Sequence, residues 1–365
     1  MEKFKVALFF CLFIGFNSYS AEVEQTKNLS FANSKLEVVP LVQLKKDLWQ
    51  KDETIVFIHI PKTAGTNIVN LMDAIAIVNP DLKVKRASVP RTKDKSPNLF
   101  VESSIGGLQQ IKDHASHYNG SKGHLDFISS HMPIPEEKDE EKYFGKQKIS
   151  YVALIRDPIK RELSSANFDF QRSYIKQKDI TYYLLKETID NPQTRLLAGE
   201  DAMSGKCNEE TLMRAKKNII RRFKFVAPTE DLEIMMNILS SHFGIKNIAY
   251  ARAQITGLKA IEKQEKFLYD GLAKKHKYDI ELYNWAKMQW KRWKALNIES
   301  ISNNIYYDSK AKYLTMLPDF VKTKKPEEMD IRQILEYNHN NKNELISFQQ
   351  KHNASARKEV KIILE

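Results

Sequence analysis

Four runs of apolar residues, rich in Ile, Val and Phe, recur along the chain without polar alternation. They lie at 54–60 (TIVFIHI), 125–130, 149–155 and 223–227. Runs of this kind are typical of strands buried on both faces of a parallel sheet. Segments with apolar residues at helical spacing lie between them, for example NIVNLMDAI from residue 67. The pattern predicts an α/β domain with a mainly parallel sheet and crossover helices.

The first run breaks at Pro61 into a short turn that opens a helix. A strand, a tight turn and a helix N-terminus place backbone N–H groups around a bound anion. We name this segment the anion turn; its residues are Lys62, Thr63, Ala64, Gly65, Thr66 and Asn67. It is not a Walker loop, in which a Gly-rich run precedes the Lys. An ATP or GTP hydrolase is therefore the weaker interpretation.

The third run leads into a second turn, Arg156-Asp157-Pro158, which also precedes a helical segment. Arg156 at the strand end and Ser164 two turns into the helix can converge on one phosphate, which the guanidinium would bind bidentately. Taken alone, the turn is equally an ordinary helix N-terminus capped by Asp157. Two anion-binding turns, each after a strand, argue against that alternative.

Together the two turns resemble the phosphate-binding segments of the carbohydrate sulfotransferases, which include heparan sulfate 2-O-sulfotransferase. In that family PKTAGT binds the 5′-phosphosulfate of 3′-phosphoadenosine 5′-phosphosulfate (PAPS). The pattern R-D-P-x-x-R-x-x-S holds the 3′-phosphate, a role that carries over to Arg156 and Ser164. The resemblance implies a P-loop-like three-layer fold. Further similar segments are Gly123-His124, NPQTRLLAG from 191, FKFVAPTEDL from 223 and KYDIELY from 277.

The resemblance implies an enzyme that transfers the sulfuryl group of PAPS to a carbohydrate hydroxyl by in-line attack at sulfur. Lys62 would neutralise the leaving phosphate, and His124 would act as the general base. The sequence departs from the 2-O-sulfotransferases at Lys122, where they carry a second His. We interpret His59 and His131 as structural. No metal is required, because Lys and Arg supply the positive charge and no compact cluster with ligand spacing occurs.

Three arginines are candidates for the acceptor site. Arg195, in QTRLL, either binds an anionic substrate or braces the 3′-phosphate turn, unless it is a plain helix-surface residue. Arg86 and Arg91 belong to a basic segment, 83–95, that we predict to be a loop in contact with the acceptor. The net charge of +12 suits a bisphosphate nucleotide and an acidic glycan. We expect a carbohydrate partner, neutral or acidic, and no nucleic acid, because no nucleic-acid module is recognisable. The oligomeric state stays open.

A basic start, an eleven-residue apolar run and small residues make 1–20 a signal peptide or a membrane anchor. This predicts the secretory pathway, in a Golgi-like lumen or membrane-associated, or the periplasm or secretion in a bacterium. Residues 50–295 would form the sulfotransferase domain, and 296–365 a helical C-terminal extension of unknown role.

Two other functions compete with the enzyme. A non-catalytic polyanion- or glycan-binding protein could retain the same fold, but the presence of both Lys62 and His124 argues against it. A P-loop kinase is disfavoured by the missing Walker sequence, and no obvious Mg²⁺-binding Asp follows a strand.

Overall fold

The structure is a computed structural model. It describes residues 36–38, 40–50, 52–78, 82–87, 107, 109–111, 125–171, 174–175, 180–244, 249–251 and 266–302. The predicted leader at 1–20, Arg91, His124 and residues 303–365 of the predicted extension lie outside this part. Within the described residues, no helix has both the length and the apolar character needed to cross a membrane.

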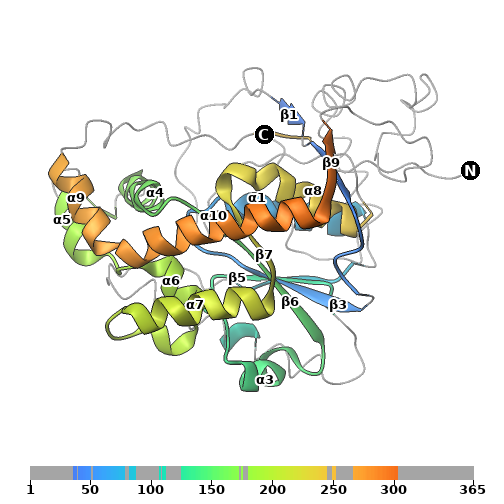
Figure 1. Cartoon of the computed structure of the whole chain (residues 1–365), viewed down its shortest axis with the longest axis horizontal. Coiled ribbons are helices and arrows are strands. Elements are labelled where there is room, and N and C mark those ends of the chain that lie inside the picture. Colours follow the sequence, from blue (N-terminus) through green and yellow to red (C-terminus); the bar gives the residue numbers. More distant parts are fainter. Residues whose placement is uncertain are drawn as a thin grey trace, which may run out of the picture.

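A five-stranded sheet forms the centre of the fold (Figure 1). Its order is β4-β5-β3-β6-β7, and every neighbouring pair of strands is parallel. The strands are β3 (Glu53–Ile58), β4 (Val84–Ala87), β5 (Phe127–Ser130), β6 (Lys148–Ile155) and β7 (Phe223–Pro228). The four apolar runs of the sequence form β3, β5, β6 and β7. The predicted α/β class with a mainly parallel sheet is therefore confirmed.

Helices cover both faces of the sheet. Ile55 and Phe57 of β3 belong to one core, whereas Val56 and Ile58 belong to the core on the opposite face. The first core is closed by α1 (Gly65–Val78) and α8 (Leu232–His242). The second is closed by α3 (Glu140–Phe144), α6 (Pro192–Ala198) and α7 (Glu209–Arg222). The predicted three layers are thus present, and they explain why these strands lack polar alternation.

Four further helices complete the fold of the described residues. The long helix α10 (Lys277–Asn297) lies along the β7 side of the sheet and contributes residues to both cores (Figure 1). A small separate cluster joins three further helices. They are α4 (Pro158–Gln171), α5 (Ile180–Tyr182) and α9 (Lys266–Lys275).

The edge strand β4 corrects one sequence-based prediction. Residues 84–87, placed in the predicted loop 83–95, are extended and pair in parallel with β5. Arg86 is opposite Ser129 in this register, so its backbone belongs to the sheet and not to a loop. Charged residues are common on edge strands, where they discourage pairing with another chain. Because β4 contains charged residues, a search for apolar runs does not detect it.

Two short antiparallel pairs lie outside the main sheet. One pairs β2 (Leu41–Leu44) with β9 (Ile298–Ser302), and the other pairs β1 (Leu36–Val38) with β8 (Ala249–Ala251). The described fold therefore extends beyond the predicted domain limits of 50 and 295. The segment predicted as a helical extension, 296–365, begins with the last residues of α10 and continues into a strand, β9.

Candidate functional site

The sheet has a topological switch point between β3 and β6. From β3 the chain passes to β4 and β5 on one side, and then to β6 and β7 on the other. Ligands of open α/β sheets bind beyond the carboxyl ends of the strands at such a point. The anion turn follows β3 and Arg156 follows β6, so both flank the switch point.

The backbone of the anion turn is shaped to expose N–H groups. Lys62 and Ala64 have positive φ angles of 67° and 61°, and left-handed residues in such a turn create a concave nest of N–H groups. The buried hydroxyl of Thr63 donates to the Ile60 carbonyl at 2.8 Å, so this side chain holds the turn and does not face a ligand. Because α1 begins at Gly65, its first N–H groups add to the nest.

Gly65 allows the imidazole of His59 to lie against the start of α1. A Cβ atom at position 65 would stand 2.2 Å from Cδ2 of His59. The buried His59 ring stacks on Phe57, with ring centroids 5.5 Å apart, and lies 4.1 Å from the ring of His131. This ring stack connects the N-terminus of α1 with the end of β5.

Arg156 makes direct contact with the anion turn. Its Nη1 donates to the Lys62 carbonyl at 2.9 Å. Its own peptide is fixed by the buried amide of Gln193, which accepts from the Arg156 N–H at 3.0 Å and donates to the Arg156 carbonyl at 2.8 Å. The second turn therefore touches the anion turn, whereas the convergence of Arg156 and Ser164 on one phosphate stays a prediction.

Two helix ends cap each other behind Gln193. The buried carboxylate of Asp279, in α10, accepts from the backbone N–H groups of Gln193 and Thr194 at 3.1 and 2.7 Å, and thus caps α6. In return the side chain of Asn191 accepts from the N–H groups of Tyr278 and Asp279 at the start of α10. Burial raises the pKa of Asp279, while these hydrogen bonds oppose the shift. The NPQTR and KYD segments thus position Arg156.

Helix α4 brings its Ser164 face toward Lys62. The Lys62 Nζ lies 4.1 Å from the ring centroid of Phe168, which is one turn after the partly exposed Ser164 on this helix. Asp157 caps α4 by accepting from the Lys160 N–H at 2.9 Å. The capping interpretation of the Arg-Asp-Pro turn and the anion-binding one are therefore compatible.

Arg195 is a structural brace. Its guanidinium is buried, and its five N–H groups donate to five acceptors. These acceptors are the Asp190 carbonyl and carboxylate and the carbonyls of Ala202, Ser204 and Gly205. With every donor used inside the protein, the prediction that Arg195 binds the substrate is not supported.

His124 lies outside the described residues, so its assignment as the base stays a prediction. The next residue, Leu125, is described, and its carbonyl accepts from the Thr54 hydroxyl at 2.6 Å. Thr54 lies at the amino end of β3, about 13 Å of strand before Ile58 and thus away from the anion turn. By contrast, His131 follows the carboxyl end of β5, on the edge where the turn lies.

The geometry at His131 suits a general base. Its Nδ1 lies 2.6 Å from the His59 carbonyl. A carbonyl oxygen can only accept, so Nδ1 carries the proton and Nε2 is the basic nitrogen of the neutral ring. The side chain is partly exposed. One signal in the sequence points to His131: it directly follows a predicted strand, as do the anion turn and Arg156.

Charges of both signs surround the site. Burial lowers the pKa of Arg156, and the nearby carboxylates of Glu230 and Asp157 oppose the shift. Glu230 is held by the Tyr283 hydroxyl, which donates at 2.6 Å.

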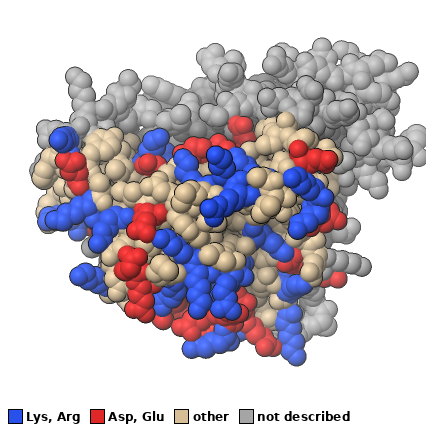
Figure 2. All heavy atoms as spheres, viewed as in Figure 1, with Lys and Arg blue, Asp and Glu red and all other residues tan. Residues whose placement is uncertain are grey.

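On the face shown in Figure 2, Lys and Arg side chains intermingle with Asp and Glu. Among the described residues, no group of three or more His, Cys, Asp or Glu could hold a metal ion.

Comparisons with known proteins leave the function open. No family model matches the sequence, and no curated protein matches it. Among solved structures, a crystal structure of an uncharacterized protein from Eubacterium ventriosum ATCC 27560 aligns over 52% of this chain and 97% of that chain. The identity is 10% and the TM-score 0.25. A similarity at this level carries no information about function.

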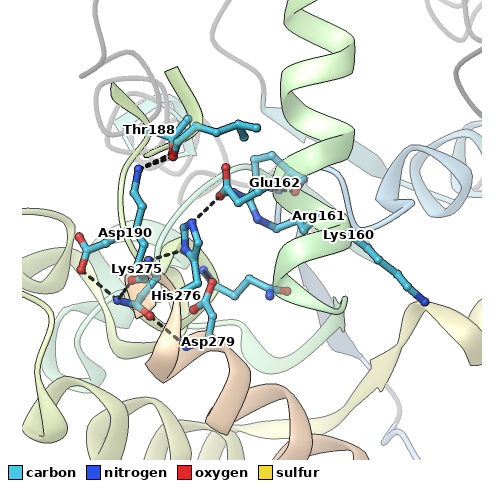
Figure 3. A network of polar contacts seen from close by, with 12 residues as sticks. Lys160, Arg161, Glu162, Thr188, Asp190, Lys275, His276 and Asp279 are labelled. Atoms are coloured by element: carbon cyan, nitrogen blue, oxygen red, sulfur yellow. Dashed lines mark hydrogen bonds and ion pairs between the residues drawn. The ribbon is translucent and has the colours of Figure 1, made fainter. Parts of the chain in front are cut away.

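A buried polar network extends from the capped ends of α6 and α10 to α4 (Figure 3). The fully buried His276 accepts the Asn191 N–H on Nδ1 at 3.1 Å, and its Nε2 lies 3.7 Å from the carboxylate of Glu162. Burial, and then the charges of Arg161 and Lys275, hold the pKa of His276 well below its usual range. The folded protein therefore keeps this imidazole neutral.

This neutral imidazole predicts a loss of stability in mild acid. Below about pH 6.5 the His276 side chain of the unfolded chain takes up a proton. In the folded protein His276 stays neutral at the same pH, so the unfolded state binds more protons than the folded state. Stability then falls as the pH drops through 6.5, by up to about 1.4 kcal/mol per unit. Urea unfolding at pH 7.5, 6.5 and 5.5 should show this loss, and His276→Asn should reduce it, since Asn keeps an acceptor for the Asn191 N–H.

His242 provides the comparison for that experiment. Burial lowers its pKa as well, so it adds to the same loss, and some pH dependence should remain in His276→Asn. An unchanged pH dependence in His276→Asn would contradict the assignment.

Proposed function

We propose that the protein is a sulfotransferase that transfers the sulfuryl group of PAPS to a hydroxyl of a carbohydrate. The observation that carries the proposal is the contact between the Arg156 guanidinium and the Lys62 carbonyl, 2.9 Å apart. It joins two anion-binding elements at the switch point of the sheet. A nucleotide with a 5′-phosphosulfate on the anion turn and a 3′-phosphate on Arg156 and Ser164 uses both.

In the proposed reaction the acceptor oxygen attacks sulfur in line with the leaving phosphate oxygen. The bond from sulfur to the phosphate oxygen breaks, and a bond from sulfur to the acceptor oxygen forms. The turn's N–H groups and Lys62 neutralise the charge on the leaving 3′-phosphoadenosine 5′-phosphate (PAP). Nε2 of His131 takes the proton of the hydroxyl. We thus assign to His131 the role that the sequence suggested for His124.

Titration calorimetry with PAP and with ATP tests the donor assignment. We expect the wild type to bind PAP more tightly than ATP. Lys62→Ala and Arg156→Ala should each weaken PAP binding about ten- to a hundredfold, because each removes a charge-assisted contact. Lys160→Ala is the control, since this exposed side chain points away from the buried network (Figure 3). Tighter binding of ATP than of PAP would contradict the proposal and favour a kinase.

Transfer of labelled sulfate from PAPS to a panel of glycans tests catalysis. We expect wild-type protein to sulfate at least one acidic or neutral glycan, and Lys62→Ala to sulfate none at a comparable rate. A wild type that binds PAPS and glycans but transfers no sulfate would instead be a glycan-binding protein that retains the fold.

A further inference from the structure

We propose that Arg161 is a positioning residue that sets the shape of the anion turn. The proposal rests on the proposed function for the identity of the nucleotide, but the geometry concerns the turn itself. Arg161 lies on the first turns of α4, five residues after Arg156. It is 4% exposed, so it is not placed to contact a substrate.

The two arginines hold successive carbonyls of the turn. Nη1 of Arg161 donates to the Pro61 carbonyl at 3.3 Å, and Nη1 of Arg156 donates to the Lys62 carbonyl. In a trans peptide the C=O and the following N–H point in opposite directions. The N–H groups of Lys62 and Thr63 therefore point away from the arginines. Arg161 thus fixes the direction of an N–H that the 5′ group of the donor would meet.

The position of Arg161 is in turn set by the buried network. Its Nη2 donates to the carboxylate of Glu162, which lies next to His276 in the structure (Figure 3). Burial lowers the pKa of Arg161 only to about 10, so the guanidinium stays charged at neutral pH.

The contacts form a closed path around the site. From Arg161 they run through Glu162 and His276 to Asn191. From there they continue through α10 and α6 to the peptide of Arg156. The Arg156 side chain returns to the anion turn. Both anion-binding elements are thus connected to one buried network, through which we expect the spacing between the two phosphates of a bound nucleotide to be set.

The test compares two ligands that differ only at the 5′ position. PAP uses the anion turn and Arg156, whereas adenosine 3′-phosphate lacks the group that the turn binds. In Arg161→Lys, a single ammonium group cannot replace the guanidinium, which donates to both the Glu162 carboxylate and the Pro61 carbonyl. We expect its affinity for PAP to fall at least about tenfold, with the affinity for adenosine 3′-phosphate changed less than about twofold. An equal loss for both ligands would mean a merely structural role and would overturn the proposal.

Arg222→Lys is the matched control. Arg222 is also largely buried, and it donates to the Pro135 carbonyl at 2.7 Å and to the carboxylate of Glu140. We expect this variant to lose stability and to keep both nucleotide affinities. If Arg161→Lys does not fold, the double variant Arg161→Met, Glu162→Gln takes its place in the test. The double variant removes both charges of the buried Arg161–Glu162 ion pair together.

Hydrogen exchange makes the test independent of the nucleotide. In the ligand-free protein, Arg161→Lys should speed exchange of the Asn67 N–H, which donates to the Ala64 carbonyl within the anion turn at 3.0 Å, and Arg222→Lys should not. Unchanged exchange in the turn would overturn the positioning role, even if the wild type failed to bind PAP. A wild type that binds neither nucleotide, but whose turn exchanges faster in Arg161→Lys, would contradict the proposed function and support the positioning role.

Discussion

Replacing His131 by Asn should slow sulfuryl transfer by about two to four orders of magnitude, the usual contribution of a general base. Asn can still donate to the His59 carbonyl, which now lies 2.6 Å from Nδ1, but it has no basic nitrogen in place of Nε2. The binding of PAP should therefore change little. The measurement is the transfer rate at saturating PAPS, together with calorimetric titration of PAP.

The pH dependence distinguishes a base from a packing residue. The wild-type rate should fall on acidification as the imidazole takes up a proton, whereas the residual rate of His131→Asn should lack this step. His242→Asn is the control, since this His lies at the end of α8 and packs against Trp49, with ring centroids 4.7 Å apart. If His124→Ala abolished transfer and His131→Asn did not, the sequence-based assignment would be correct after all.

The central strands were predictable because burial on both faces leaves a strong pattern. Within β3 all six residues are buried, so the sequence shows an apolar run and not an alternation. The edge strand β4 has only one neighbour and includes Lys85 and Arg86. Its formation depends on pairing with β5, a tertiary contact that a local pattern does not reveal. The same holds for β2 and β9, which are far apart in the sequence.

At the site, the sequence located the two turns because each directly follows a recognisable strand. Lys62 and Arg156 both follow parallel strands, so their proximity follows from the topology. The same rule, applied to β5, points to His131, whereas the sequence-based choice of His124 stays a prediction. Arg195 could not be understood in this way, because three of its five acceptors are carbonyls of the segment 202–205. Only the folded backbone brings these acceptors together.

The second large effect is expected at Gly65, where alanine should disrupt the anion turn. The added Cβ would stand 2.2 Å from Cδ2 and 2.5 Å from Nε2 of His59. This ring has little room to move, because it is buried between Phe57 and His131. The start of α1 must then shift and take the N–H groups of the turn with it. We expect a loss of about 1–3 kcal/mol in unfolding free energy, as for other overpacked sites, and PAP binding weakened at least about tenfold.

A neighbouring helix offers the control for this prediction. At Gly271 in α9 a Cβ would come within 2.7 Å of Cδ2 of Leu185, the end of a flexible side chain that can turn aside. Gly271→Ala should therefore leave PAP affinity unchanged and cost little stability, since Ala favours the helix by about 0.5–1 kcal/mol. In Gly65→Ala combined with His59→Ala the overlap disappears, so PAP binding should recover in part. If the double variant bound no better than Gly65→Ala, contact with the His59 ring would not be the reason for glycine at this position.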